Sequence, residues 1–159
     1  QGKPYKANEP DLLRWVHLIK TVSFLNAYQH LAMQPLSAFD CNRSVEEMNK
    51  VGEMLGAINL PSSLQDSQHA IGQYEPELDF DERTRETIQS IENYSVGWTE
   101  KPFFSLILKS SFDIVPHWLL QKLQRTPDGC LQMNGRKVAL QIASQPVQWC
   151  GVRTFASRV

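Results

Sequence analysis

Residues 10–33 read PDLLRWVHLIKTVSFLNAYQHLAM, and this stretch decides the fold. Pro10 and Asp11 suit the first turn of a helix, because proline lacks an amide hydrogen that would be unpaired there and acidic groups complement the helix dipole. Apolar residues then recur almost all the way round a helical wheel as far as Met33, and Pro35 marks the stop. A helix that is apolar on nearly every side is packed by several neighbours. We therefore expect a central, buried helix here.

The rest of the chain repeats helical spacing, and the alternation typical of strands is almost absent. The pattern predicts an all-α fold, a bundle of about six helices around the central one, in a single domain over residues 1–159. Turn and capping signals place the further helices. A capping box at Ser44–Glu47 opens one that ends near Gly56, Pro61-Ser62-Ser63 begins one that Pro76 ends, and Asp79 or Asp81 caps one that reaches Tyr94. The pattern then predicts a helix over Phe103–Val115, a short one after Pro116, a helical stretch at Val138–Ala143, and a last short helix or loop from Pro146.

Charge and length exclude several function classes. Sixteen basic residues nearly balance seventeen acidic ones, so there is no broad basic field and no nucleic acid partner is expected. No run of about 18 apolar residues exists, so no membrane span is expected.

Cys41, Cys130 and Cys150 lie far apart without a CxxC spacing, and an odd number fits inert thiols in a reducing compartment. With no signal peptide after Gln1, we expect a cytoplasmic location and a fragment of a longer protein.

Standard catalytic and metal-binding motifs are absent from the sequence. It contains no GxGxxG, GxxxxGK[ST], HExxH or GxSxG pattern. The four histidines, His17, His30, His69 and His117, include no pair spaced three or four residues apart, so a zinc site on one helix is not supported. His30 suits a helix C-terminus, His69 is expected to be exposed, and His117 is expected to be structural.

His17 differs from the other histidines because it lies inside the most apolar helix. A buried imidazole needs either a hydrogen-bonding partner or a metal for its ring nitrogens. One nitrogen of a neutral imidazole can bind haem iron while the other donates to an acceptor that fixes the tautomer. Leu13, Thr21 and Phe24, at i−4, i+4 and i+7, are expected to offer a mostly apolar wall to a flat macrocycle. A core histidine hydrogen-bonded to backbone is the other interpretation, and both stay open.

The order of several short motifs resembles one protein family. The run from Tyr5 to His17, YKANEPDLLRWVH, resembles the signature of the MpaB and latex-clearing-protein (rubber oxygenase) catalytic domain, a Tyr-x-Ala-x-Asp-Pro pattern followed by a Leu-x-Trp-Val-His helix. Asn8-Glu9-Pro10 departs from that pattern. Later segments extend the resemblance over about residues 5–123: Met48–Gly56, Leu60–Ser63, Gln73–Glu75 and Lys101–Leu119.

The resemblance implies an all-α oxygenase that holds haem b and uses dioxygen to cleave carbon–carbon double bonds of isoprenoid chains. It maps the axial iron ligand onto His17 and implies an apolar small-molecule substrate. Distal polar residues in some members precede the motif, and only sixteen residues precede His17, so we expect the chain to be the C-terminal part of a longer catalytic domain. The alternative is a non-catalytic helical binding module of the same fold without haem. The sequence leaves the substrate, the redox partner and the oligomeric state open.

Overall fold

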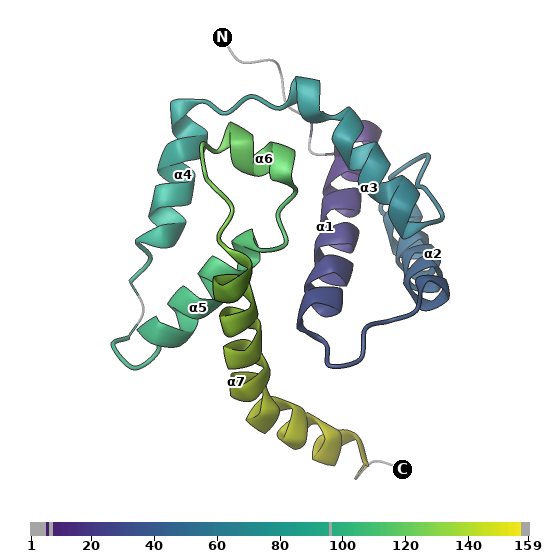
Figure 1. Ribbon diagram of the computed structural model, residues 1–159. Coiled ribbons are helices and arrows are strands. Elements are labelled where there is room, and N and C mark those ends of the chain that lie inside the picture. The colour runs from purple at the N-terminus through teal and green to yellow at the C-terminus, as the bar shows by residue number, and fades with distance from the viewer. Residues whose placement is uncertain (1–5, 7, 96, 157–159) are drawn as a thin grey trace. The chain divides into compact units, whose positions relative to one another are not determined.

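The computed structural model describes residues 6, 8–95 and 97–156, with side chains described only as far as residue 143. Within these residues every regular element is helical, and there are seven α-helices, which confirms the all-α prediction of about six helices around a central one. In chain order the elements are α1 (Pro10–Leu31), α2 (Ala38–Met54), α3 (Leu64–Gln73), the 3₁₀ turn η1 (Glu75–Glu77), α4 (Glu82–Glu92), α5 (Lys101–Phe112), α6 (His117–Lys122) and α7 (Cys130–Ala156), as Figure 1 shows.

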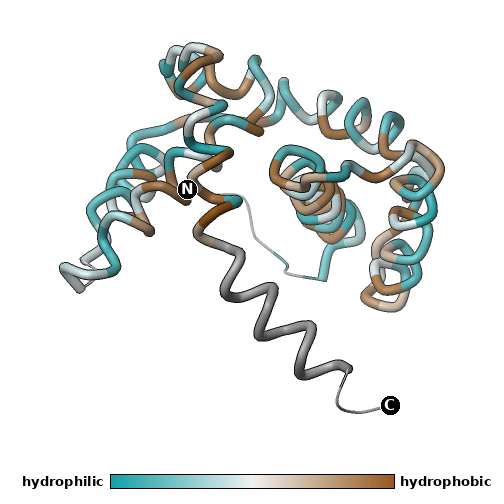
Figure 2. Tube along the Cα trace, turned by 60° about the horizontal axis from the view of Figure 1, so that its bottom comes forward, coloured by the Kyte–Doolittle hydropathy of each residue, from teal (hydrophilic) through white to brown (hydrophobic). Residues whose placement is uncertain are grey.

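The helices form two compact units. Unit 1 comprises residues 1–29 and 34–79, and unit 2 comprises residues 30–33 and 80–159. Apolar and polar residues are mixed along the helices of both units (Figure 2). None of the described helices combines the length and the apolar composition that a membrane-spanning segment needs.

In unit 1, helix α1 packs against α2 and α3, as predicted for the central helix. Its buried residues form one stripe that repeats every three to four positions. That stripe consists of His17, Leu18, Thr21, Val22 and Leu25. Val16, Phe24 and Tyr28 are at least half exposed in the chain as described, so the burial of α1 is concentrated on one side.

Tyr74 fastens the end of α3 to the start of α1. Its hydroxyl donates to the Asp11 carboxylate at 2.8 Å and accepts from the Arg14 guanidinium at 2.8 Å. Its ring lies 4.8 Å from the ring of Trp15, centroid to centroid. Burial raises the pKa of the Tyr74 phenol, and the hydrogen bond to Asp11 raises it further. The neutral phenol is therefore part of the packing of unit 1.

Helix α2 begins six residues before the predicted capping box, so the prediction of a start at Ser44 was wrong. Ser37 is the N-cap: its hydroxyl oxygen accepts from the Asp40 amide at 3.1 Å and its hydrogen is donated to the Asp40 carboxylate at 2.6 Å. This cap gives a hydrogen-bond acceptor to the Asp40 amide, which the helix itself would leave unpaired. Ser44 lies inside the helix and donates to the Asp40 carbonyl at 2.8 Å instead.

The other end of α2 is placed as the sequence predicted. Gly56 has a φ of 100°, which is in the left-handed region, and its amide donates to the Glu53 carbonyl at 3.0 Å. The Ala57 amide donates to the Gly52 carbonyl at 2.9 Å. These two bonds make a Schellman cap, which favours glycine at this position. The apolar residues of α2 are only partly buried: Val45 is fully buried, whereas Val51, Met54 and Leu55 are exposed.

Two further helix starts in the chain agree with their capping signals. Ser63 caps α3 and Asp81 caps α4, each by accepting the amide three residues later. Hydrogen bonds from the backbone amide and hydroxyl of Thr84 lower the pKa of the Asp81 carboxyl. Pro76 lies in η1, directly after α3, where a helix stop was expected.

In unit 2 the last helix is longer than the sequence predicted. The helical stretch at Val138–Ala143 lies inside α7, which begins at Cys130 and continues through Pro146, so the prediction of a new element at Pro146 was wrong. Helix α7 packs along α5. Such tertiary contacts stabilise a helix whose own sequence pattern is weak.

A charged cluster holds α5, α7 and the turn between α6 and α7 together. The Arg136 guanidinium pairs with Asp113, with an Nε to Oδ2 distance of 3.0 Å, and with Asp128 at 2.8 Å. The Arg136 and Asp113 side chains are only 13% and 3% exposed. The hydrogen bond to Asp113 raises the pKa of Arg136. Unit 2 therefore has a largely buried ion pair, Arg136 with Asp113, and a second carboxylate, Asp128, that is half exposed.

Candidate functional site

His17 is buried in unit 1, with 6% of its surface exposed. Its Nε2 atom lies 3.2 Å from the Oδ1 atom of Asn49 on α2 and 3.4 Å from the Oγ1 atom of Thr21 on its own helix. The Asn49 side-chain nitrogen in turn donates to the Pro61 carbonyl at 2.8 Å. These four residues form a polar network among apolar neighbours.

The network fixes which ring nitrogen carries the hydrogen. The Pro61 carbonyl only accepts hydrogen bonds, so the Asn49 amide must present its NH₂ group there. Its Oδ1 atom then faces His17 and can only accept, so Nε2 of His17 is the donor. In the neutral imidazole, Nδ1 is left with the lone pair.

The opposite edge of the ring lies against the backbone of α2 at Gly52. A Cβ atom built on Gly52 would be 2.8 Å from both Cε1 and Nδ1 of His17, and 2.8 Å from a methyl group of Leu60. Real Cβ atoms do not approach other atoms that closely, so this position needs glycine for close contact between the helices. Nδ1 of His17 therefore faces helix backbone and not an open space.

The structure brings together only part of the predicted wall around His17. Thr21 is 1% exposed and touches the ring through its hydroxyl. Leu13 is half-buried and lies toward Gly56 at the end of α2. Phe24 is 64% exposed and does not share the burial of His17. Asn49, Gly52 and Pro61 were missed, because no local pattern in the sequence brings α2 and its following loop to this histidine.

A histidine that holds haem needs one ring nitrogen directed at the iron and the other on a protein acceptor. In unit 1 the acceptor is present, because Asn49 takes the hydrogen of Nε2. The nitrogen for iron is not accessible, because Nδ1 packs against Gly52. As packed, the residues around His17 do not fit a haem group.

Among the side chains that the structure describes, the remaining histidines and cysteines form no second cluster. Among the described residues there is no group of three or more His, Cys, Asp or Glu side chains that could hold a metal ion. His30 lies in the last turn of α1, and its Nε2 atom is buried with no hydrogen-bond partner among the described residues. His69 is exposed as predicted, and His117 is also exposed. Cys41 is buried and Cys130 is exposed, whereas the Cys150 side chain lies outside the described residues.

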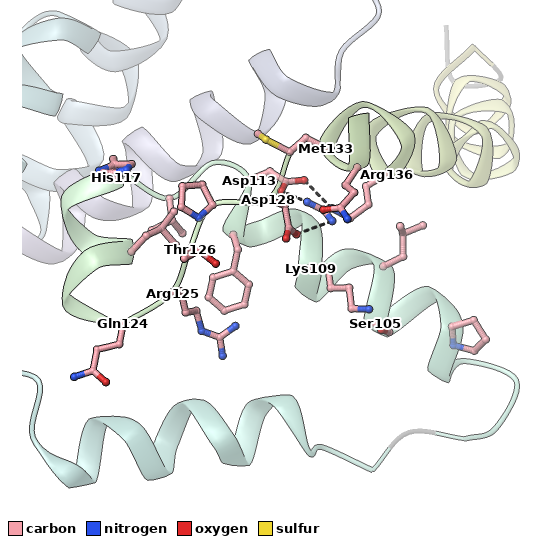
Figure 3. A pocket seen from close by; sticks show the side chains of 17 residues that line it. Ser105, Lys109, Asp113, His117, Gln124, Arg125, Thr126, Asp128, Met133 and Arg136 are labelled. Carbon is pink, nitrogen blue, oxygen red and sulfur yellow. Dashed lines mark hydrogen bonds and ion pairs between the residues drawn. The ribbon is translucent and has the colours of Figure 1, made fainter. Parts of the chain in front are cut away.

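A pocket of about 1060 Å³ lies within unit 2, between α5, α6 and the first turns of α7. Figure 3 shows Lys109, Arg125 and the Arg136 cluster among its lining side chains. The sequence did not reveal this pocket, because its lining residues come from several elements and no motif marks them. A Thr-Pro-Asp-Gly turn at residues 126–129 was the one local signal, and three of its four residues line the pocket.

Comparison with known proteins gives one result. The family model described as "ER-bound oxygenase mpaB/B'/Rubber oxygenase, catalytic domain" matches residues 1–143. No curated protein and no solved structure matches the chain.

Proposed function

The chain belongs to the ER-bound oxygenase mpaB/B′ and rubber oxygenase catalytic-domain family, and we propose that it is part of an oxygenase that oxidises an apolar, isoprenoid-like substrate with dioxygen. The observation that carries this proposal is the family match, which extends over residues 1–143 of 159. The all-α fold agrees with it. Reaction class comes from the family, since a fold alone does not define a function.

Haem b is the cofactor that the family resemblance implies, and His17 is the iron ligand proposed from the sequence. Haem would supply the activation of dioxygen when bound. Iron binding at His17 requires a change from the packing described above: either Nε2 releases Asn49, or the Nδ1 edge moves away from Gly52. We therefore derive no catalytic step through haem at this residue.

A second candidate function is a helical binding module of the same fold without haem. The packing of His17 favours it, because Nε2 already has a protein partner in Asn49 and a second polar neighbour in Thr21. A buried polar group that is satisfied in this way contributes to the uniqueness of a core and needs no metal. In this case His17 joins α1 to α2, and ligand binding takes place elsewhere on the chain.

Haem titration separates the two candidates. The full chain and two variants, His17→Ala and the exposed His69→Ala as a matched control, are titrated with hemin while the Soret band and the far-ultraviolet circular dichroism are recorded. The haem oxygenase predicts a Soret band that His17→Ala abolishes and His69→Ala leaves unchanged. The haem-free module predicts that no variant gains the band while all stay helical. A band that survives His17→Ala would reject His17 as the ligand.

The oxygenase proposal itself is tested by oxygen uptake. An oxygen electrode records dioxygen consumption by the hemin-supplemented chain in the presence of squalene, an isoprenoid hydrocarbon, and in its absence. Substrate-dependent uptake supports the proposal, and uptake that is equal with and without squalene contradicts it. The expected cytoplasmic location stays a prediction, which cell fractionation checks, because the family description includes ER-bound members.

A further inference from the structure

The pocket in unit 2 is lined by apolar and by charged side chains. Its apolar lining comes from Leu106 and Phe112 on α5, Leu120 on α6 and Met133 on α7. Its volume of about 1060 Å³ is at the upper end of the size that small-molecule sites have. Such a site takes a ligand with an extended apolar body, and a few polar groups at its edge fix the orientation of that ligand.

The charged residues of the pocket differ in whether they are already paired. Arg136 pairs with both Asp113 and Asp128, so this cluster has no free positive charge and carries a formal net charge of −1. Arg125 pairs with Glu92 and lies over the Phe112 ring, with its guanidinium carbon 4.3 Å from the ring centroid. Two opposite charges that are paired in this way attract a charged ligand only weakly.

The backbone places Arg125 by a Schellman cap at the end of α6. Gln124 has a φ of 54°, its amide donates to the Gln121 carbonyl at 2.9 Å, and the Arg125 amide donates to the Leu120 carbonyl at 2.9 Å. Glutamine is unusual in the left-handed conformation, which favours glycine. The chain therefore turns at Gln124 so that the Arg125 side chain reaches Phe112 in the wall of the pocket.

Lys109 is the remaining cation of the lining. It lies on α5, one turn before Phe112, and its side chain is exposed at the pocket. Figure 3 shows Lys109 and Arg125 apart from the Asp113, Asp128 and Arg136 cluster. Among the described residues no ion pair involves Lys109, and Leu106 and Phe112 lie one helical turn before and after it on α5.

From this arrangement we propose that the pocket in unit 2 binds an amphipathic monoanion, a carboxylate on a long apolar chain, with the carboxylate on Lys109. The inference does not rest on haem or on oxygenase activity, because binding is measured without turnover. It also does not involve His17, since every residue that lines the pocket belongs to unit 2.

Isothermal titration calorimetry of the full chain with dodecanoate and with neutral dodecanol tests the proposal. A charge-assisted hydrogen bond to Lys109 predicts that dodecanoate binds about tenfold more tightly than dodecanol. Lys109→Gln is expected to reduce this preference to about twofold or less. Lys101→Gln, on the same helix but outside the lining, is the matched control and keeps the preference.

Three results would overturn the proposal. They are that neither compound binds, that both compounds bind with equal affinity, and that Lys109→Gln leaves the carboxylate preference intact. Circular dichroism of both variants confirms that they are folded. A second variant, Leu106→Gln, is expected to weaken the binding of both compounds by about tenfold, because it places a polar group among the apolar lining residues. Unchanged affinity in Leu106→Gln would place the apolar chain elsewhere.

Discussion

The two units of the chain each bury a polar cluster, and the two clusters differ in charge. In unit 1, His17, Asn49 and Thr21 form a network that works without a formal charge when the imidazole is neutral. In unit 2, Arg136 is held between Asp113 and Asp128. The neutral cluster joins two helices closely enough to require glycine at position 52. The charged cluster instead lies in the wall of a pocket.

This difference shows what each cluster contributes. A neutral network costs little to desolvate, and it specifies how side chains fit when every group is satisfied. A buried ion pair costs more to desolvate, and its removal on one side leaves an uncompensated charge. We therefore expect unit 2 to be more sensitive than unit 1 to the loss of a single polar side chain.

The largest effect is expected for Arg136→Ala. Asp113 is 3% exposed and would be left as a buried carboxylate without its main partner. Breaking a buried pair in this way costs about 3–5 kcal/mol. Urea denaturation measures the loss in the free energy of unfolding. In the double variant with Asp113→Ala much of the loss should be recovered, and a double variant as unstable as Arg136→Ala would show that the pair is not the cause.

The matching change in unit 1 is Asn49→Leu. Leucine has a similar volume but leaves the Nε2 hydrogen of His17 and the Pro61 carbonyl without their partner. Each unsatisfied buried group costs about 1–3 kcal/mol, so we expect a loss of about 2–3 kcal/mol in the same urea experiment. A loss larger than that of Arg136→Ala would reverse the proposed order of the two clusters.

The close approach of α1 and α2 is tested by a pair of glycine substitutions. Gly52→Ala places a methyl group 2.8 Å from the His17 ring, and its overpacking exceeds the gain in helix propensity, for a net loss of about 1 kcal/mol. Gly72→Ala in α3 meets nothing within 4 Å and should stabilise by about 0.5–1 kcal/mol. Thermal unfolding of both variants measures these shifts. If both substitutions stabilise, the ring does not lie where we describe it.

A similarly small effect is expected at the wall of the unit 2 pocket. Gln124→Gly removes a side chain from a left-handed position, so the Schellman cap of α6 should become more stable by about 1 kcal/mol. The corresponding position in α2 already has glycine, at Gly56, and Gly56→Gln should lose a similar amount. Thermal unfolding checks both directions. A destabilised Gln124→Gly would mean that the glutamine side chain itself holds the turn.

Local signals predicted much of the fold. Pro10 and Asp11, the glycine at position 56 and the Ser63 and Asp81 caps act within one helical turn, so the sequence alone places those helix ends. The start of α2 was missed because the cap at Ser37, earlier in the chain than Ser44, begins the helix. The length of α7 was missed because its sequence has only a weak helical pattern. Local sequence patterns do not show which of two possible capping residues begins a helix.

The candidate site was predicted in part for the same reason. Burial of His17 follows from the apolar residues around it on α1. Its partner does not, because Asn49 lies 32 residues away on a helix that the sequence shows only as amphipathic. The pocket lining in unit 2 is equally non-local, since Lys109 and Arg136 line the same pocket only when α5 and α7 pack.

The central claim is that Nε2 of His17 gives its hydrogen to Asn49, and the tautomer of this imidazole tests it most directly. A long-range ¹⁵N–¹H correlation spectrum of the ¹⁵N-labelled chain, with His17→Gln for assignment, identifies which ring nitrogen is protonated. The account predicts a protonated Nε2 and a bare Nδ1. A hydrogen on Nδ1 with Nε2 bare would contradict it, and would leave Nε2 as the nitrogen available to iron.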